Sequence, residues 1–97
     1  MLNKNQIKYL KSLSNTIENK YQIGKNELGE TQLQMLSNAL DKYELIKISI
    51  NRSVIDAKEE YASELVELLH AEFIQMVGGV ITIYRKNLKE PKIKLPR

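Results

Sequence analysis

The chain has 97 residues, of which 42% are hydrophobic and 28% are charged, a balance typical of one globular domain and unlike that of a disordered segment. It contains no cysteine, which excludes disulfide bonds and thiolate metal sites. No stretch approaches the ~18 consecutive apolar residues of a membrane span, and the start lacks the apolar core of a signal peptide, so we expect a cytoplasmic protein without a membrane partner.

The net charge of +3 is unevenly distributed. Residues 1–55 contain eight Lys or Arg and five acids, and residues 56–72 contain one Lys and six acids. Residues 85–97 contain six basic residues and one acid. The sequence therefore predicts basic ends and an acidic middle, an asymmetry that suits a polyanion approached from one side.

Residues 6–17 have the pattern of an amphipathic helix. Apolar side chains recur at three- and four-residue steps, at Ile7, Leu10, Leu13 and Ile17. At ~100° per residue, three lysines fall within about 60° of one another beside this stripe: Lys4, Lys8 and Lys11. The helix thus has a basic edge, which is either ordinary solvation or a contact for anions.

A short apolar run at residues 21–23 stops at Gly24, Lys25 and Asn26, before a new helical pattern begins. This order predicts a strand, an exposed loop and a helix start. Glycine permits close backbone approach, and Lys25 adds a positive charge, so the loop has the chemistry to hold a phosphate. The alternative is a turn that needs its glycine for geometry alone.

The next two elements have clear periodicity. Residues 30–43 predict a second helix, with inward side chains at Leu33, Leu36, Leu40 and Tyr43. Residues 44–50 predict a strand in which three isoleucines alternate with polar side chains: Ile46, Ile48 and Ile50 with Lys47 and Ser49. Arg52 follows in a predicted turn.

A third helix is expected over residues 56–70. Its predicted inward side chains are Tyr61, Leu65, Leu68 and Leu69, and its outward ones are Glu59, Glu60, Glu64 and Glu67. This acidic face should repel RNA. Two β-rich runs then surround Gly78 and Gly79, whose freedom to adopt positive φ predicts a hairpin over residues 73–84.

The expected fold class is α+β, with the order α-β-α-β-α-β-β and a four-stranded mixed sheet packed by helices. Helix crossovers favour parallel connections between the first three strands, and the hairpin makes the last strand antiparallel to the third. Residues 1–86 form the predicted domain. Residues 87–97 contain two prolines and four basic residues, which predict a basic, extended tail.

No catalytic arrangement is visible in the sequence. His70 is the only histidine and follows the acidic helix, where a capping role is simplest. The carboxylates of that helix share one solvated face, and no nucleophile motif is present. We therefore expect no catalytic residue, no metal and no cofactor; a small hydrolase is the least favoured alternative.

Several residues resemble the pattern of bacterial YhbY-like proteins, the stand-alone CRM domains named for chloroplast RNA splicing and ribosome maturation. The matching positions are Gln6, Tyr9-Leu10, Gln22-Ile23-Gly24-Lys25, Leu28, Leu40, Glu44-Leu45-Ile46-Lys47, Lys58, Gln75, Gly78 and Tyr84-Arg85. The resemblance covers about residues 2–86 and is most specific at 22–25 and 44–47. It implies the fold of the C-terminal domain of translation initiation factor three.

The resemblance also implies a function, namely RNA binding and assistance to the maturation of large ribosomal subunit precursors. The family's G-x-x-G loop, compared with the backbone-clamping loop of KH domains, maps onto residues 24–27. Here Glu27 stands in place of the second glycine and adds a negative charge and a Cβ, and Gly29 lies two positions late.

The expected partner is ribosomal RNA, with ribosomal proteins as further candidates and no small-molecule substrate. The predicted RNA-binding residues are Lys4, Lys8, Lys11, Gly24, Lys25, Asn26, Lys47, Arg52 and Arg85. Tyr9, Tyr21 and Tyr84 either stack on bases or pack in the protein. The alternative function is a protein-interaction module that docks a ribosomal protein through the acidic helix or the tail, without direct RNA contact.

Overall fold

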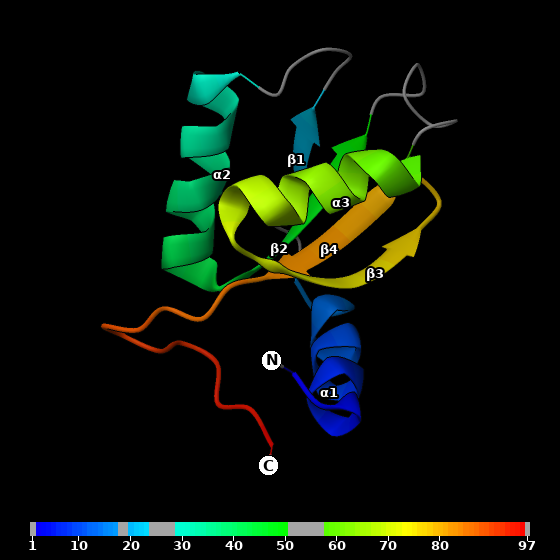
Figure 1. Cartoon of the computed structure of the whole chain (residues 1–97). Helices are drawn as coiled ribbons and strands as arrows, with labels where there is room; N and C mark the ends of the chain where they lie inside the picture. Colours follow the sequence, from blue (N-terminus) through cyan, green and yellow to red (C-terminus); the bar gives the residue numbers. More distant parts are fainter. Residues whose placement is uncertain (1, 18–19, 24–28, 51–57, 97) are drawn as a thin grey trace.

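The computed structural model describes residues 2–17, 20–23, 29–50 and 58–96, and Figure 1 shows the arrangement of its helices and strands. The elements are α1 (Lys4–Ser14), β1 (Lys20–Ile23), α2 (Glu30–Tyr43), β2 (Leu45–Ile50), α3 (Lys58–Leu69), β3 (Glu72–Val77) and β4 (Val80–Tyr84). This order confirms the predicted α+β class. Four predicted site residues, Gly24, Lys25, Asn26 and Arg52, lie outside the described residues.

The sheet has the strand order β1-β2-β4-β3. β1 pairs with β2 in parallel, and β4 is antiparallel to both of its neighbours. The hairpin is confirmed, and Gly78 at its turn has a φ of +60°, a conformation that side chains with a Cβ rarely adopt. β3 runs in the same direction as β2, as predicted, but β4 lies between them.

The main core lies between one face of the sheet and the helices α2 and α3. From β2 it contains the three alternating isoleucines, and Ile48 has no exposed surface. One predicted inward side chain of α3 is wrong: Leu68 is 47% exposed, whereas Ala62, Leu65 and Leu69 are buried. Leu68 comes one helical turn after the exposed Glu64 and so shares its outward side.

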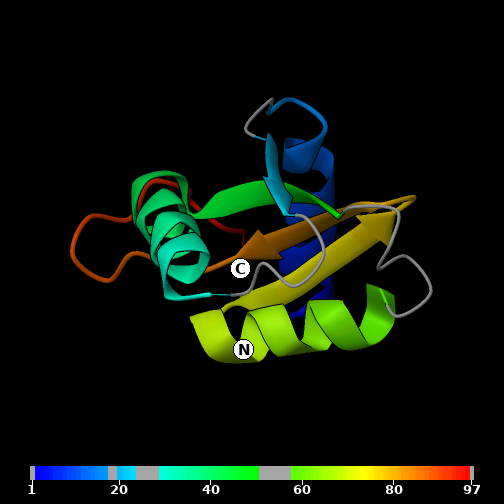
Figure 2. The ribbon, with the colours of Figure 1, turned by 90° about the horizontal axis from the view of Figure 1, so that it is seen from above.

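A second apolar cluster lies on the other face of the sheet, under α1. Leu10 of α1 packs there against Leu45, Ile74 and Tyr84, all of them buried. The face of β2 opposite to the isoleucines is therefore apolar at its first residue, Leu45, and polar along the rest of the strand. Viewed from above, the sheet lies between α3 on one side and α1 on the other (Figure 2).

Residues 86–96 contain no helix or strand, yet they fold back onto the domain. The apolar side chains of Ile93 and Leu95 pack against the second cluster. Gln6 Nε2 donates a hydrogen bond of 3.0 Å to the carbonyl oxygen of Pro96. The segment that was predicted to be an extended tail is thus attached to α1 and to the face of the sheet that α1 covers. No helix among the described residues is long and apolar enough to cross a membrane.

Candidate nucleic-acid interface

α1 is fixed at both ends by polar contacts. At its start, Asn3 Oδ1 accepts from the Gln6 N–H at 2.8 Å, while the Asn3 N–H donates to Gln6 Oε1 at 3.0 Å, which forms a capping box. At its end, the buried Ser14 hydroxyl accepts from Gln75 Nε2 of β3 at 3.1 Å. Because the buried Leu10 faces the sheet, the basic edge defined by Lys4, Lys8 and Lys11 is exposed.

Lys47 lies on the same side of the sheet as α1. Its backbone is paired with Lys20 of β1 and with Thr82 of β4, and Thr82 is in turn paired with Gln75. Directly paired residues share a face of a sheet, and Gln75 donates its hydrogen bond to Ser14 of α1. The half-buried Lys47 therefore belongs to the α1 side.

Polar side chains extend this surface beyond Lys47. Gln22 of β1 is exposed and is paired with the half-buried Ser49 of β2. By strand alternation both lie on the α1 side, since Tyr21 and Ile48 pack in the main core. The α1 side thus combines exposed lysines with an uncharged polar strip.

β1 and β2 end at neighbouring positions, and the residues that follow them, including the predicted contacts Gly24, Lys25, Asn26 and Arg52, lie outside the described residues. Ile23, the last residue of β1, is paired in parallel with Ile50, the last residue of β2. The carboxyl ends of parallel strands meet at one edge of a sheet. Ile23 and Ile50 therefore lie side by side at this carboxyl edge, and the carbonyl of Gly79 accepts from the Ile50 N–H at 2.7 Å.

α1 and this carboxyl edge lie at opposite ends of β1. In Figure 1, α1 lies below the point where β1 begins, and the arrow of β1 points away from α1 toward the start of α2. The structure thus brings Lys47 to the side of the α1 lysines, whereas Ile23, the last described residue before Gly24, lies at the far end of β1.

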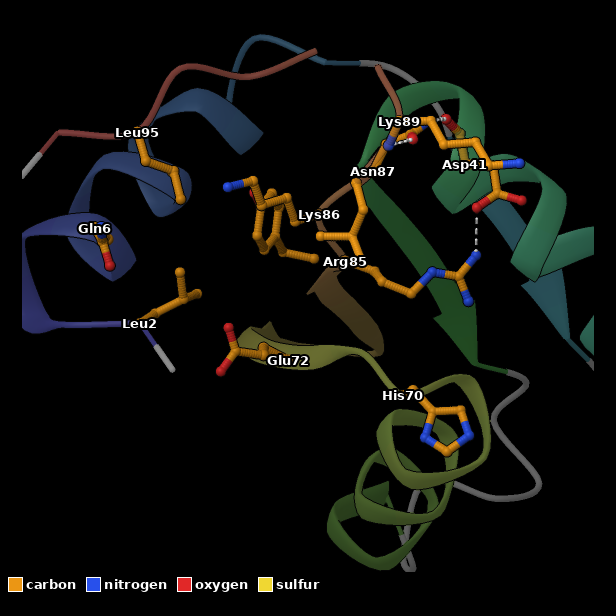
Figure 3. Close-up of a pocket in the computed structure, with 12 residues that line it drawn as sticks. Leu2, Gln6, Asp41, His70, Glu72, Arg85, Lys86, Asn87, Lys89 and Leu95 are labelled. Atoms are coloured by element: carbon orange, nitrogen blue, oxygen red, sulfur yellow. Dashed lines mark hydrogen bonds and ion pairs between the residues drawn. The ribbon is translucent and has the colours of Figure 1, made fainter. Parts of the chain in front are cut away.

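Arg85 serves the fold. Its guanidinium donates to the carbonyl oxygen of Leu69 at 2.9 Å, to the carbonyl and hydroxyl oxygens of Ser37 at 2.8 and 3.0 Å, and to Asp41 Oδ1 at 2.9 Å. Figure 3 shows the guanidinium directed toward Asp41. Arg85 therefore joins the end of β4 to α2 and to the last turn of α3. Because these donors are used inside the molecule, we do not propose Arg85 as an RNA contact.

The three tyrosines considered for base stacking differ in exposure. Tyr84 is only 2% exposed, and Tyr21 packs against the main core, whereas Tyr9 of α1 is 41% exposed. Burial raises the pKa of the Tyr84 hydroxyl to about 12, and the carboxylates of Glu44 and Glu72 contribute to the rise. Of these three rings, Tyr9 alone is open enough to stack on a base.

A groove of about 940 Å³ lies between the start of α1, the start of β3 and the segment after β4 (Figure 3). Its lining carries both signs of charge, with the acids Asp41 and Glu72 and the bases Arg85, Lys86 and Lys89. Such mixed charge favours neither a polyanion nor a cation. Among the described residues, no group of three or more His, Cys, Asp or Glu is placed to hold a metal ion.

Sequence reasoning missed the role of Glu44. This residue ends α2 at a φ of 64° and has no exposed surface. Its carboxylate accepts from the backbone N–H groups of Asn87, Lys92 and Ile93 at 2.6, 2.5 and 2.6 Å. The sequence did single out Glu44, because this residue opens one of the two most specific stretches of the family resemblance. Its role was not predictable, because its hydrogen-bond partners lie more than forty residues away in the sequence.

Comparison with known proteins gives a consistent assignment. The model of the "CRS1 / YhbY (CRM) domain" family matches residues 2–85. "Probable RNA-binding protein YqeI" of Bacillus subtilis is 27% identical over 96 residues, which cover 99% of this chain and 100% of that protein. An "RNA-binding protein" of Haemophilus influenzae is 31% identical over 96 residues, covering 99% of this chain and 96% of the relative.

A solved structure agrees with these relatives. The solution structure of SAV1595 from Staphylococcus aureus, described as a candidate RNA-binding protein, has a TM-score of 0.81 and 35% sequence identity to this chain. The similarity covers 99% of this chain and 100% of that protein. The family resemblance and the fold that it implied are therefore confirmed, and this chain belongs to the CRS1/YhbY (CRM) domain family.

Proposed function

We propose that this protein binds ribosomal RNA in precursors of the large ribosomal subunit and assists their assembly, without catalysing a reaction. The proposed contacts are Lys4, Lys8, Lys11 and Lys47 on the α1 side, together with Gly24, Lys25, Asn26 and Arg52, which lie outside the described residues. Two of the relatives above are named RNA-binding proteins, which supports RNA as the partner.

The observation that carries the proposal is the separation of charge across the sheet. The exposed lysines of α1 and the half-buried Lys47 lie on one side, and the exposed carboxylates of α3 lie beyond the other. A polyanion is attracted to the first side and repelled by the second. An RNA helix or loop would therefore approach the α1 side.

Such a surface recognises RNA by shape. Lysine contacts to phosphate supply affinity that depends on salt but carry little sequence information. The polar strip at Gln22 and Ser49 can exchange hydrogen bonds with ribose or bases, and the ring of Tyr9 can stack on an unpaired base. We therefore expect binding to a structured site that contains both a duplex and unpaired nucleotides.

Crosslinking in cells, followed by sequencing of the attached RNA, tests this function. The expected result is an enrichment of large-subunit ribosomal RNA precursors. A chain with Lys4, Lys8 and Lys11 replaced by glutamate should lose the enrichment while it keeps its fold. Crosslinks spread over cellular RNA in proportion to abundance, or equal crosslinks from the triple variant, would contradict the proposal.

One observation favours a second candidate function. The acidic α3 and the apolar groove beside it form a face that suits a protein partner. If the chain served only as a protein-interaction module, its association with ribosomal particles would survive nuclease digestion. Loss of the association after digestion, together with direct crosslinks, would reject that function.

A further inference from the structure

An apolar groove lies between α3 and β3, which is an edge strand of the sheet. It has a volume of about 300 Å³ and is lined by Ala62, Ser63, Val66, Phe73 and Met76. Phe73 is 44% exposed, and its backbone is paired with Ile83 of the main core. The groove therefore opens on the α3 side of the sheet, away from the α1 lysines.

The rim of this groove is acidic. Ser63 lines the groove, and Glu60 and Glu67 are its i−3 and i+4 neighbours on α3, so their side chains flank it. Both glutamates are exposed, and neither forms an ion pair within the described residues. No lysine or arginine occurs in the sequence between Lys58 and Arg85. The carboxylates of this face consequently lack a neighbouring cation from the same stretch of chain.

We propose that this groove docks a lysine- or arginine-rich segment of a partner protein, with one large apolar side chain of that segment inserted beside Phe73. The cavity volume accommodates a single large side chain, and exposed aromatic surface commonly marks such anchor sites. The glutamates would hold the flanking cations by charge complementarity. RNA is not a suitable occupant because its phosphates would face the same carboxylates.

This inference goes beyond the proposed RNA-binding function and does not depend on it. The two surfaces lie on opposite sides of the sheet and share no residue. A partner in the groove would leave the α1 side open, so the protein could hold a basic protein segment and an RNA at the same time.

The test uses the full chain and a short synthetic peptide in which lysines surround one central phenylalanine. Binding is measured by fluorescence anisotropy at physiological salt, and the site is mapped by NMR shifts of the backbone amides. We expect shifts at the groove residues. Two matched peptides, one with serine for phenylalanine and one with glutamate for lysine, should each bind roughly tenfold more weakly.

Variants of the protein sharpen the test. Ser63→Arg fills the groove mouth and adds a positive charge that repels the lysines of the peptide. It should therefore weaken the binding of the lysine-phenylalanine peptide roughly tenfold. Ser12→Arg places the same change on an exposed position of α1 and should have no effect. Glu67→Gln should weaken binding more than Glu64→Gln, because Glu64 is not adjacent to Ser63 on the helix surface.

Three results would overturn the inference. Equal peptide affinity for Ser63→Arg and the parent would show that the peptide binds elsewhere. Sedimentation as a dimer that Ser63→Arg converts to a monomer would assign the groove to a second copy of the chain. Shifts of the groove amides on addition of RNA, and none with the peptide, would assign this face to RNA.

Discussion

The carboxylate of Glu44 accepts a 2.6 Å hydrogen bond from the backbone N–H of Ile93, a residue 49 positions later in the chain. Two further backbone N–H groups, from Asn87 and Lys92, donate to the same carboxylate. A buried charge is costly unless it is fully hydrogen-bonded, and here three donors from one irregular segment satisfy it. The conformation of residues 87–93 and the burial of Glu44 therefore depend on each other.

Glu44→Gln should lower the free energy of unfolding by about 2–3 kcal/mol, because the amide turns an N–H donor toward backbone donors that need an acceptor. Urea denaturation measures the loss. Hydrogen exchange should also become faster at the amides of Asn87, Lys92 and Ile93. Glu30→Gln, at an exposed position in the first turn of α2, is the matched control and should cost less than about 1 kcal/mol. Equal stability of the two variants would refute this role of Glu44.

Replacing Lys4, Lys8 and Lys11 together with alanine should weaken binding to ribosomal RNA fragments and flatten its dependence on salt. For each phosphate that a lysine no longer neutralises, the slope of log K against log salt concentration should decrease by about 0.7–0.9. The control is Lys42→Ala, an exposed lysine of α2 on the other side of the sheet. The role of the α1 lysines would be rejected if the parent's affinity hardly changed between low and physiological salt.

Two variants with opposite expected effects test the predicted loop at residues 24–28, which lie outside the described residues. If the loop clamps an RNA backbone, Lys25→Ala should weaken binding, whereas Glu27→Gly should strengthen it by removing a repelling charge and a side chain. Folding must be checked first, since glycine near a helix start can cost up to about 1 kcal/mol. If both variants bind like the parent while mutation of Lys4, Lys8 and Lys11 abolishes binding, the loop is only a turn and α1 carries the contact.

Ile48→Asp should abolish folding. Ile48 has no exposed surface and lies mid-strand in the main core, so aspartate would bury an unpaired charge at a cost above about 4 kcal/mol. Circular dichroism during heating shows the loss of the folded state. Ile48→Val, which removes one methylene, should cost only about 0.5–1.5 kcal/mol and retain RNA binding. A folded aspartate variant with the parent's melting temperature would contradict the assignment of the core face.

The raised pKa of Tyr84 predicts that the folded protein loses stability at alkaline pH. Its pKa in the folded protein, about 12, exceeds the ordinary value of 10.0, so the folded state holds the proton more tightly than the unfolded chain does. The stabilisation is complete below pH 10 and is lost as the pH rises from 10 to 12. Denaturation midpoints across this range should fall more steeply for the parent than for Tyr84→Phe. Parallel curves would show that Tyr84 does not titrate in this way.

Most of the fold was predictable from local patterns. The alternation at Ile46, Ile48 and Ile50 identified the buried face of β2, and the paired glycines identified the hairpin. The insertion of β4 between β2 and β3 left no local trace, because strand order depends on long-range packing. Leu68 was misplaced because an apolar side chain next to the core stripe can still point outward, and among the described residues Leu68 is 47% exposed.

The candidate site was only partly predictable. Composition and helical spacing correctly placed the α1 lysines on an exposed edge. They could not reveal that Arg85 is hydrogen-bonded to Ser37 and Asp41, because these partners are over forty positions away in the sequence. The sequence alone therefore does not distinguish an arginine that contacts solvent from an arginine whose guanidinium is hydrogen-bonded within the domain. Gln6 and Gln75, two positions of the family resemblance, likewise connect α1 to distant parts of the chain, through hydrogen bonds to Pro96 and Ser14 respectively.

The strand order has a consequence for the assembly of the protein during synthesis. β4 leaves the ribosome last among the strands, yet it lies between β2 and β3 and pairs with both. Until residues 80–84 emerge, β3 has no neighbour in the sheet, and the main core lacks Ile81 and Ile83. The nascent chain must therefore wait for its last strand before the native sheet can close, and a truncation before Val80 should leave an unfolded chain.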